Sequence, residues 1–252
     1  MESTSELILR RWVDRTPTRW FYFAAAVVIL VVATASFGPE LLDQSHNLAP
    51  YTWLIIAHSV TFTAWLIVLI IQTLLIQSGS FALHRRVGTV SMGLAALMVV
   101  LGYATAIAMM HRGFDISGSL GGRIDRAQQI DGLIFPLLDI VEFAVLVTMG
   151  YLWRHKAAAH KRLMLFATVA LLPAPFAHFI GHSVVLREHP AIVVLPIAVS
   201  LIASGVYDLA RFRRIHPISL WLGIGLFVID NFCATVVGPS AAWHAFAGWL
   251  IA

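Results

Sequence analysis

Hydrophobic residues form seven long runs along the chain, and polar residues gather in the short segments between them. Each run approaches the roughly 20 apolar residues that an α-helix needs to cross a bilayer. We therefore predict seven membrane-spanning helices, at Trp20–Phe37, Tyr51–Ile76, Val87–Met110, Ile130–Trp153, Leu163–Leu186, Ala191–Ala210 and Ile218–Val237. Because the connections are short, no soluble domain is expected between the helices.

The expected fold is an all-α integral membrane bundle, with a polar lead-in at residues 1–19, seven helices at 20–237 and a tail at 238–252. Aromatic residues at helical spacing in the tail predict an amphipathic helix on the outer membrane surface. Gly38 and Pro39 are expected to end the first helix. The first run, followed by Ala33-Thr34-Ala35, could also imitate a signal peptide, but it exceeds the usual apolar length of about 7–15 residues.

Composition and charge support a membrane protein. Of the 252 residues, 59% are hydrophobic and 12% are charged, with a net charge of +4. Thirteen of the 17 basic residues fall on one side of the predicted membrane, which places the N-terminus in the cytoplasm and the C-terminus outside. The excess of basic residues thus reflects the membrane topology rather than a nucleic-acid partner. The single cysteine, Cys233, excludes an intramolecular disulfide and a cysteine metal cluster.

Several predicted helices carry polar residues that are costly in lipid and therefore point to function. His178 and His182 share one face of the fifth helix, which Pro173 and Pro175 should kink near mid-depth. A stripe with a seven-residue interval occupies the second helix, at His58, Trp65 and Gln72. Carboxyl groups lie within the fourth and seventh helices, at Asp139, Glu142 and Asp230.

Helix rise places three histidines and two or three carboxyl groups in the outer half of the membrane, where they could converge. Nitrogen and oxygen donors without thiolate suit zinc, iron or manganese. The candidate metal ligands are His58, His178, His182, Asp139 and Asp230. Asp139 and Glu142 are also candidate catalytic residues that orient or activate water. The alternative is that these side chains only hold neighbouring helices together.

A second polar set lies at the predicted inner face, where His84, His155 and His160 each stand near arginine or lysine. Adjacent cations favour neutral imidazole, which is the form that binds haem or metal. Plain interfacial loops explain this set equally simply. Beside it, Tyr207 and Asp208 precede a group of arginines and predict an ion-pair set at the inner surface, with Arg211, Arg213 and Arg214.

The run from His58 through Trp65 and Gln72 to HRRVG (84–88), followed by HKRLM (160–164), resembles uncharacterised bacterial multi-pass membrane families. These carry a helix with histidine and glutamine, then HR-x-x-G, then H-x-x-(L/W)-M. The layout is similar to that of membrane b-type cytochromes, in which histidines of neighbouring helices bind haem in pairs. The resemblance implies haem b, an outer pair of His58 with His178, and an inner pair of His84 with His160. His84 and His160 depart from it, since both fall outside the predicted helices.

The site type is also similar to that of seven-helix zinc hydrolases of the alkaline ceramidase and adiponectin-receptor kind. This similarity implies zinc and a lipid-like amide or ester substrate, although the HxxxH pair lies on the fifth helix here and Leu54 stands where a serine is expected. The leading expectation is a metal- or haem-binding redox protein of the bacterial inner membrane, with its site at the buried histidines and carboxyl groups in the outer half of the membrane and a quinone or lipid-like partner. A non-catalytic sensor or assembly factor is a third possibility.

Overall fold

The computed structural model describes residues 19–43, 45, 50–112, 126–180 and 190–251. Within these residues the chain is helical and contains no strand. Seven helical stretches of the described chain are long and apolar enough to cross a membrane. The predicted all-α bundle of seven membrane-spanning helices is therefore confirmed.

The first four spans are single helices: α2 (Arg19–Leu42), α3 (Trp53–Gln77), α4 (Phe81–Arg112) and α5 (Arg126–Leu152). The fifth span is divided into α6 (Ala157–Val169) and α7 (Pro173–Ile180). A 3₁₀ turn, η1 (Pro190–Val194), leads into α9 (Leu195–Phe212). The last span is α10 (Pro217–Phe232), which continues as a π-helix, η2 (Cys233–Val237), and is followed by α11 (Ala241–Leu250).

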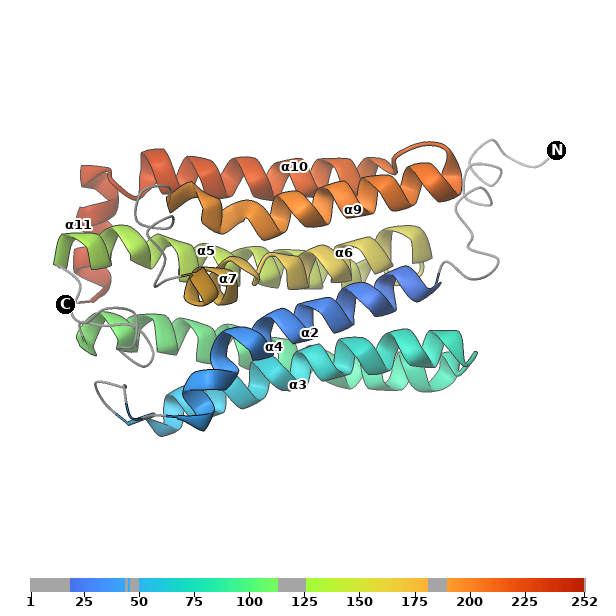
Figure 1. Cartoon of the computed structure of the whole chain (residues 1–252), viewed down its shortest axis with the longest axis horizontal. Coiled ribbons are helices and arrows are strands. Elements are labelled where there is room, and N and C mark those ends of the chain that lie inside the picture. Colours follow the sequence, from blue (N-terminus) through green and yellow to red (C-terminus); the bar gives the residue numbers. More distant parts are fainter. Residues whose placement is uncertain (1–18, 44, 46–49, 113–125, 181–189, 252) are drawn as a thin grey trace.

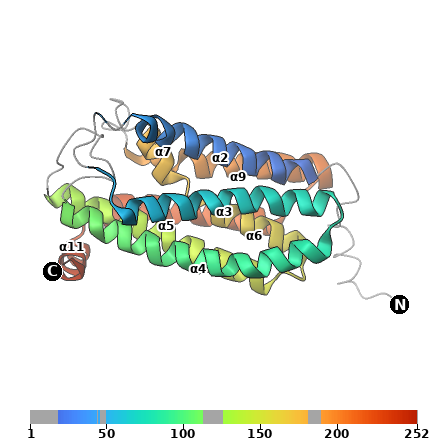
Figure 2. The same cartoon turned by 90° about the horizontal axis from the view of Figure 1, so that it is seen from below.

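The helices α5 and α6 lie in the middle of the bundle, between the α3–α4 hairpin and the α9–α10 hairpin (Figure 1). A view turned by 90° shows the long helices running side by side along the bundle axis (Figure 2). The core is centred on α6, where Phe166, Ala167 and Ala170 are fully buried. Trp65 of α3 packs edge-on against Phe143 of α5 in the same core.

The two ends of the bundle differ in charge. The start of α2 and the α3–α4, α5–α6 and α9–α10 connections lie at one end, which we call the basic end (Figure 1). The helix α11 lies at the other end, which we call the opposite end. The described cations at the basic end are Arg85, Arg86, Arg154, Lys156, Lys161, Arg162, Arg211, Arg213 and Arg214. This segregation is the pattern from which a cytoplasmic N-terminus is predicted.

Two helices begin earlier than the hydrophobic runs indicate. A tight turn at Gly79, with a φ angle of 76°, allows α4 to start at Phe81 rather than at Val87. His84 therefore lies in the first turns of α4, where its backbone N–H donates to the Ser80 carbonyl. The helix α6 likewise starts before Leu163 and includes His160. The prediction that both histidines lie outside the helices is wrong.

The first helix ends later than predicted, because α2 continues through Gly38 and Pro39 to Leu42. Pro39 lacks a backbone N–H, which removes one hydrogen bond in the last turns, but its carbonyl still accepts from the Asp43 N–H at 3.0 Å. The extension carries Glu40 onto the helix.

The predicted disruption of the fifth helix is confirmed at the two prolines. The α-helical geometry stops at Val169 and resumes at Pro173, with Pro175 in the first turn of α7. Across the break, the Leu171 and Leu172 N–H groups bond to carbonyls only three residues earlier. The break redirects α7 onto α2.

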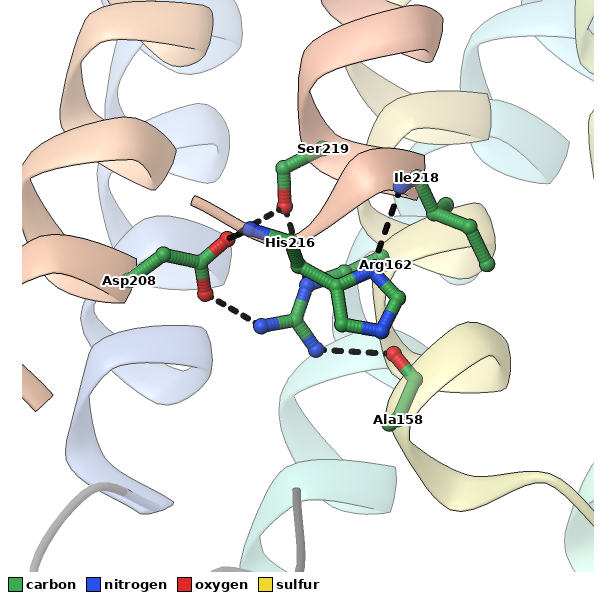
Figure 3. A network of polar contacts seen from close by, with 6 residues as sticks. All are labelled: Ala158, Arg162, Asp208, His216, Ile218 and Ser219. Carbon is green, nitrogen blue, oxygen red and sulfur yellow. Dashed lines mark hydrogen bonds and ion pairs between the residues drawn. The ribbon is translucent and has the colours of Figure 1, made fainter. Parts of the chain in front are cut away.

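A buried polar network joins three helices at the basic end (Figure 3). Arg162 of α6 is 1% exposed and binds Asp208 of α9, which is fully buried. Its Nε donates to Ser219 Oγ at 2.9 Å, and its Nη1 donates to the Ala158 carbonyl at 2.8 Å. Ser219 Oγ and the His216 N–H both donate to Asp208 Oδ2. Asp208 therefore does form an ion pair at the basic end, but it is fully buried and its partner is Arg162 of α6.

The predicted tail helix is present as α11, and it packs directly on the bundle. Trp243 Nε1 donates to the Ile130 carbonyl at 2.7 Å, while Ala247 is fully buried against the ends of α4 and α5. Phe246 and Trp249 remain exposed. Figure 1 shows α11 running across the direction of the long helices.

Candidate functional site

His84 of α4 and His160 of α6 face each other at the basic end. Their ring centres are 6.2 Å apart and their planes are inclined at 83°. Both residues are partly exposed. Because α5 packs on both α4 and α6, the two histidines come together from helices that are not neighbours in the sequence.

The close packing of α5 against α6 orients His160. A Cβ atom on Gly150 would lie 2.8 Å from Met164 Sδ and 3.4 Å from Leu163 Cβ, so a larger residue would require the Met164 side chain to shift. The backbone carbonyl of Gly150, a buried residue, accepts a hydrogen bond from His160 Nδ1 at 2.8 Å. In neutral imidazole this bond fixes the proton on Nδ1 and leaves the lone pair on Nε2.

Gln72 of α3 holds His84 through the first turns of α4. With its amide nitrogen turned toward His84, Gln72 donates to His84 Nδ1 and to the His84 carbonyl, and its oxygen accepts from the Gly88 N–H at 2.8 Å. A Cβ atom at Gly88 would lie 3.5 Å from Gln72 Nε2, an ordinary contact distance, so the contact does not require glycine. If the Gln72 amide is turned the other way, its oxygen accepts a hydrogen bond from a protonated His84 Nδ1. His84 Nε2 is then free to bind a ligand. Gln72 thus contacts two residues of the HR-x-x-G motif.

His178 of α7 binds α2. Its Nδ1 donates to the Ser36 carbonyl at 3.2 Å, and its ring lies 4.5 Å from that of Phe37. Its Nε2 lies 3.1 Å from Glu40 Oε1, close enough for an ion pair when the ring is protonated. Ser36 Oγ adds a bond to the Pro175 carbonyl. The sequence analysis did not identify Glu40 as a partner, because it assigned Glu40 to a loop.

His58 of α3 stacks on Phe62, with ring centres 4.0 Å apart. It is largely buried, and its Nδ1 has no hydrogen-bond partner among the described residues. The contacts of His58 and His178 therefore involve different helices, and the structure does not show them as a facing pair. The stripe predicted on α3 does face other helices, since Trp65 Nε1 donates to Thr168 Oγ1 of α6 at 3.1 Å.

Three carboxyl groups cluster inside the bundle. Asp139 and Glu142 of α5 are 5% and 7% exposed, and Asp230 of α10 is 2% exposed. Asp230 and Glu142 act electrostatically on Asp139, and Asp230 acts on Glu142. Both oxygens of Glu142 and Oδ2 of Asp230 are buried and make no hydrogen bond within the described residues.

A fourth carboxyl group lies at the opposite end. Asp131 Oδ1 is 2.5 Å from Nε2 of His244 on α11, and both side chains are partly exposed. His244 was not singled out by the sequence analysis, although the helical spacing of the tail already predicts α11. Its pairing with Asp131 depends on how α11 folds back on α5, which the spacing does not reveal.

The predicted five-residue metal set is not assembled in the part of the chain that the structure describes. There, no three histidine, cysteine, aspartate or glutamate side chains are placed to hold one metal ion. His182 lies outside the described residues, so the HxxxH pair itself is not tested. The predicted sites thus separate into the His84–His160 pair, the His178–Glu40 contact, His58, and the carboxyl cluster.

His216 lies outside the membrane spans, at the basic end between α9 and α10, and its titration bears on this end of the protein. Burial, followed by the positive charge of Arg162, lowers the pKa of His216 to about 4, although Asp208 opposes the shift. Neutral His216 accepts from the Ile218 N–H at 3.1 Å and so caps α10.

Comparison of the chain with protein-family profiles, curated proteins and solved structures finds no significant match.

Proposed function

We propose that this integral membrane protein binds haem b and transfers electrons in a bacterial cytoplasmic membrane, with His84 and His160 as the two axial ligands. The observation that carries the proposal is the facing pair of imidazoles, one of them oriented by the Gly150 carbonyl. The proposal agrees with the similarity of the histidine layout to that of membrane b-type cytochromes.

The separation of the rings suits two ligands of one iron. Two metal–nitrogen bonds, together with the distance from each nitrogen to its ring centre, separate the ring centres by about 6 Å. The observed value is 6.2 Å. Perpendicular ring planes are compatible with this arrangement, because each plane need only contain the bond to the iron.

The residues next to His84 and His160 also suit haem. Imidazole is an ordinary axial ligand of haem iron, and the iron changes its charge by one electron when it is oxidised or reduced. Arg85 and Arg86 follow His84, and Lys161 follows His160, so that cations stand close in sequence to both ligands. Cations of this kind complement the two propionate groups of haem.

Gln72 would act as a positioning residue. For His84 to bind through Nε2, the Gln72 amide must turn so that its oxygen accepts from Nδ1–H. The turn exchanges one hydrogen bond to His84 Nδ1 for another, and it gives up both the bond to the His84 carbonyl and the bond from the Gly88 N–H. Partners of this kind orient a ligand and raise its basicity.

The test is an absorption spectrum of the protein purified from cells with an ample haem supply, combined with elemental analysis. We expect a Soret band and α and β bands that sharpen on reduction. His84→Ala or His160→Ala should each remove most of this absorbance. His155→Ala is the matched control, since His155 is an exposed histidine of the α5–α6 connection and should leave the spectrum unchanged.

Two further variants separate the inner pair from the outer pair. His58→Ala and His178→Ala should keep the haem, because neither residue contacts the His84–His160 pair. Loss of haem in these two variants with retention in the first two would contradict the assignment. A wild-type protein that contains no haem, or stoichiometric zinc instead, would contradict the function.

A further inference from the structure

The carboxyl cluster of Asp139, Glu142 and Asp230 is not used by the haem proposal. All three side chains are more than nine-tenths buried, and they come from two helices, α5 and α10. None of them forms an ion pair within the described residues. The unpartnered oxygens of Glu142 and Asp230 therefore lie where a small ligand would satisfy them.

Within the described residues, no ion pair joins the cluster to a cation of the elements packed on α5. These elements are α4, α6, α7, α10, α11 and η2. The α10 segment contributes Asp230, and η2 contributes the thiol of Cys233, which interacts with Asp230 and Glu142. The histidines on α7 and α11 are engaged with Glu40 and Asp131, respectively.

The charge of the cluster identifies its ligand. An unpaired carboxylate inside a membrane costs several kcal/mol, and a second or third carboxylate nearby adds repulsion. The three carboxyl groups therefore need protons or a metal cation. Since they are not placed as a group to hold a metal ion, the proton is the ligand that fits.

The backbone on both helices is irregular next to the cluster. Pro136 lies three residues before Asp139 within α5 and leaves the Gly132 carbonyl without its usual helical partner. The π-helix η2 begins three residues after Asp230, and π-helical turns are frequent at functional sites. Both irregularities lie between the cluster and the opposite end.

The Asp131–His244 pair marks a route to that end. Asp131 and Asp139 are eight residues apart on α5, which corresponds to a rise of about 12 Å. Gly238, just after η2, packs so closely on α5 that its Cβ position lies 3.3 Å from the Asp131 carbonyl. The partly exposed Asp131–His244 pair is thus the nearest described titratable contact with water along α5.

We propose that Asp139, Glu142 and Asp230 form a proton-binding site within the membrane, loaded from the opposite end of the bundle past Asp131 and His244. When the site is loaded, a carboxylate takes up a proton from water and becomes a carboxylic acid. No other reactant is needed. This proposal does not depend on haem, which would lie at the basic end.

The first experiment uses dicyclohexylcarbodiimide, an apolar reagent that modifies protonated carboxyl groups, on the full-length protein in lipid nanodiscs. Mass spectrometry should find the adduct on the cluster at neutral pH, and the yield should fall as the pH is raised. Addition of Na⁺ should not protect. Asp208 is the internal control, since its carboxyl group is buried in an ion pair with Arg162, and it should remain unmodified.

Infrared spectroscopy provides the second readout. The wild type at neutral pH should show a carboxylic acid C=O band that loses intensity in Asp139→Asn, Glu142→Gln and Asp230→Asn. Asp208→Asn should leave the band unchanged. The three cluster variants replace a protonated carboxyl group by a near-isosteric neutral amide, so the protein should remain folded, which a thermal melt verifies.

The route is tested by the rate of loading. Asp131→Asn should slow the return of the acid band after a drop in pH, without changing its final intensity. If Na⁺ protected the carboxyl groups from modification, the ligand of the cluster would be a metal cation rather than a proton, and the proposal would be overturned. Absence of the adduct and of the acid band at every pH would also overturn it, and an unchanged rate in Asp131→Asn would refute the route.

Discussion

The Arg162–Asp208 network allows a quantitative test of what holds α6, α9 and α10 together. Arg162→Met keeps much of the aliphatic volume of the side chain but removes the cation from a fully buried carboxylate. Asp208 then keeps only its bonds from the His216 N–H and Ser219 Oγ. Removing one partner of a buried ion pair costs about 3–5 kcal/mol, so we expect a loss of about that size in the free energy of unfolding.

The double variant separates the ion pair from the surrounding packing. Arg162→Met combined with Asp208→Leu removes both charges together, and replacing a buried pair by apolar residues is often close to neutral. We therefore expect the double variant to recover most of the stability that Arg162→Met loses. Asp208→Asn alone should also destabilise the protein, because the buried guanidinium keeps its charge.

The assay is reversible unfolding in mixed detergent micelles, followed by circular dichroism and by tryptophan fluorescence. The control is Arg154→Met, since Arg154 is an exposed cation that lies 4.4 Å from the Tyr151 ring centre. Its contribution should not exceed about 1 kcal/mol. A loss below about 1 kcal/mol in Arg162→Met, or a double variant no more stable than that single variant, would refute the reasoning.

Two further predictions concern pH and orientation. Burial lowers the pKa of His216 from 6.5 to about 4, so the unfolded chain binds more protons than the folded chain between these two pH values. The contribution of His216 to the free energy of unfolding should therefore be complete above pH 6.5 and fall toward pH 4. His216→Asn, which retains a capping side chain without titrating, should flatten the pH dependence of the melting temperature; an unchanged slope would contradict this cause. In a variant without the native cysteine, Ser80→Cys should react from the cytoplasmic side and Ser240→Cys from outside; reversed labelling would invert the orientation of the bundle.

The helices could be predicted from the sequence because the bilayer constrains their length and composition directly. The break near Pro173 could be predicted for the same reason, since a proline removes a helical hydrogen bond wherever the helix lies. The ends of the helices were predicted less accurately. The run of apolar residues begins at Val87, but the turn at Gly79 allows helical geometry to begin at Phe81.

The partners of the polar residues could not be predicted in the same way. Helical periodicity shows which residues share a face, but it does not show which helix that face meets. His178 meets Glu40 across 138 residues of sequence, and Arg162 meets Asp208 across 46. The pairing of His84 with His160 was expected only from the resemblance to cytochromes, and the structure does bring these two residues together.

The helix α5 connects the two proposed sites and limits how strongly they can interact. Glu142 belongs to the carboxyl cluster, and the Gly150 carbonyl binds His160, so the two contacts are about 12 Å apart along one helix. At this distance and an effective dielectric constant near 20, two unit charges interact by about 1.4 kcal/mol. Protonation of the cluster would therefore change the midpoint potential of the haem by a modest amount, and the cluster would remain loaded or empty chiefly according to the pH at the opposite end.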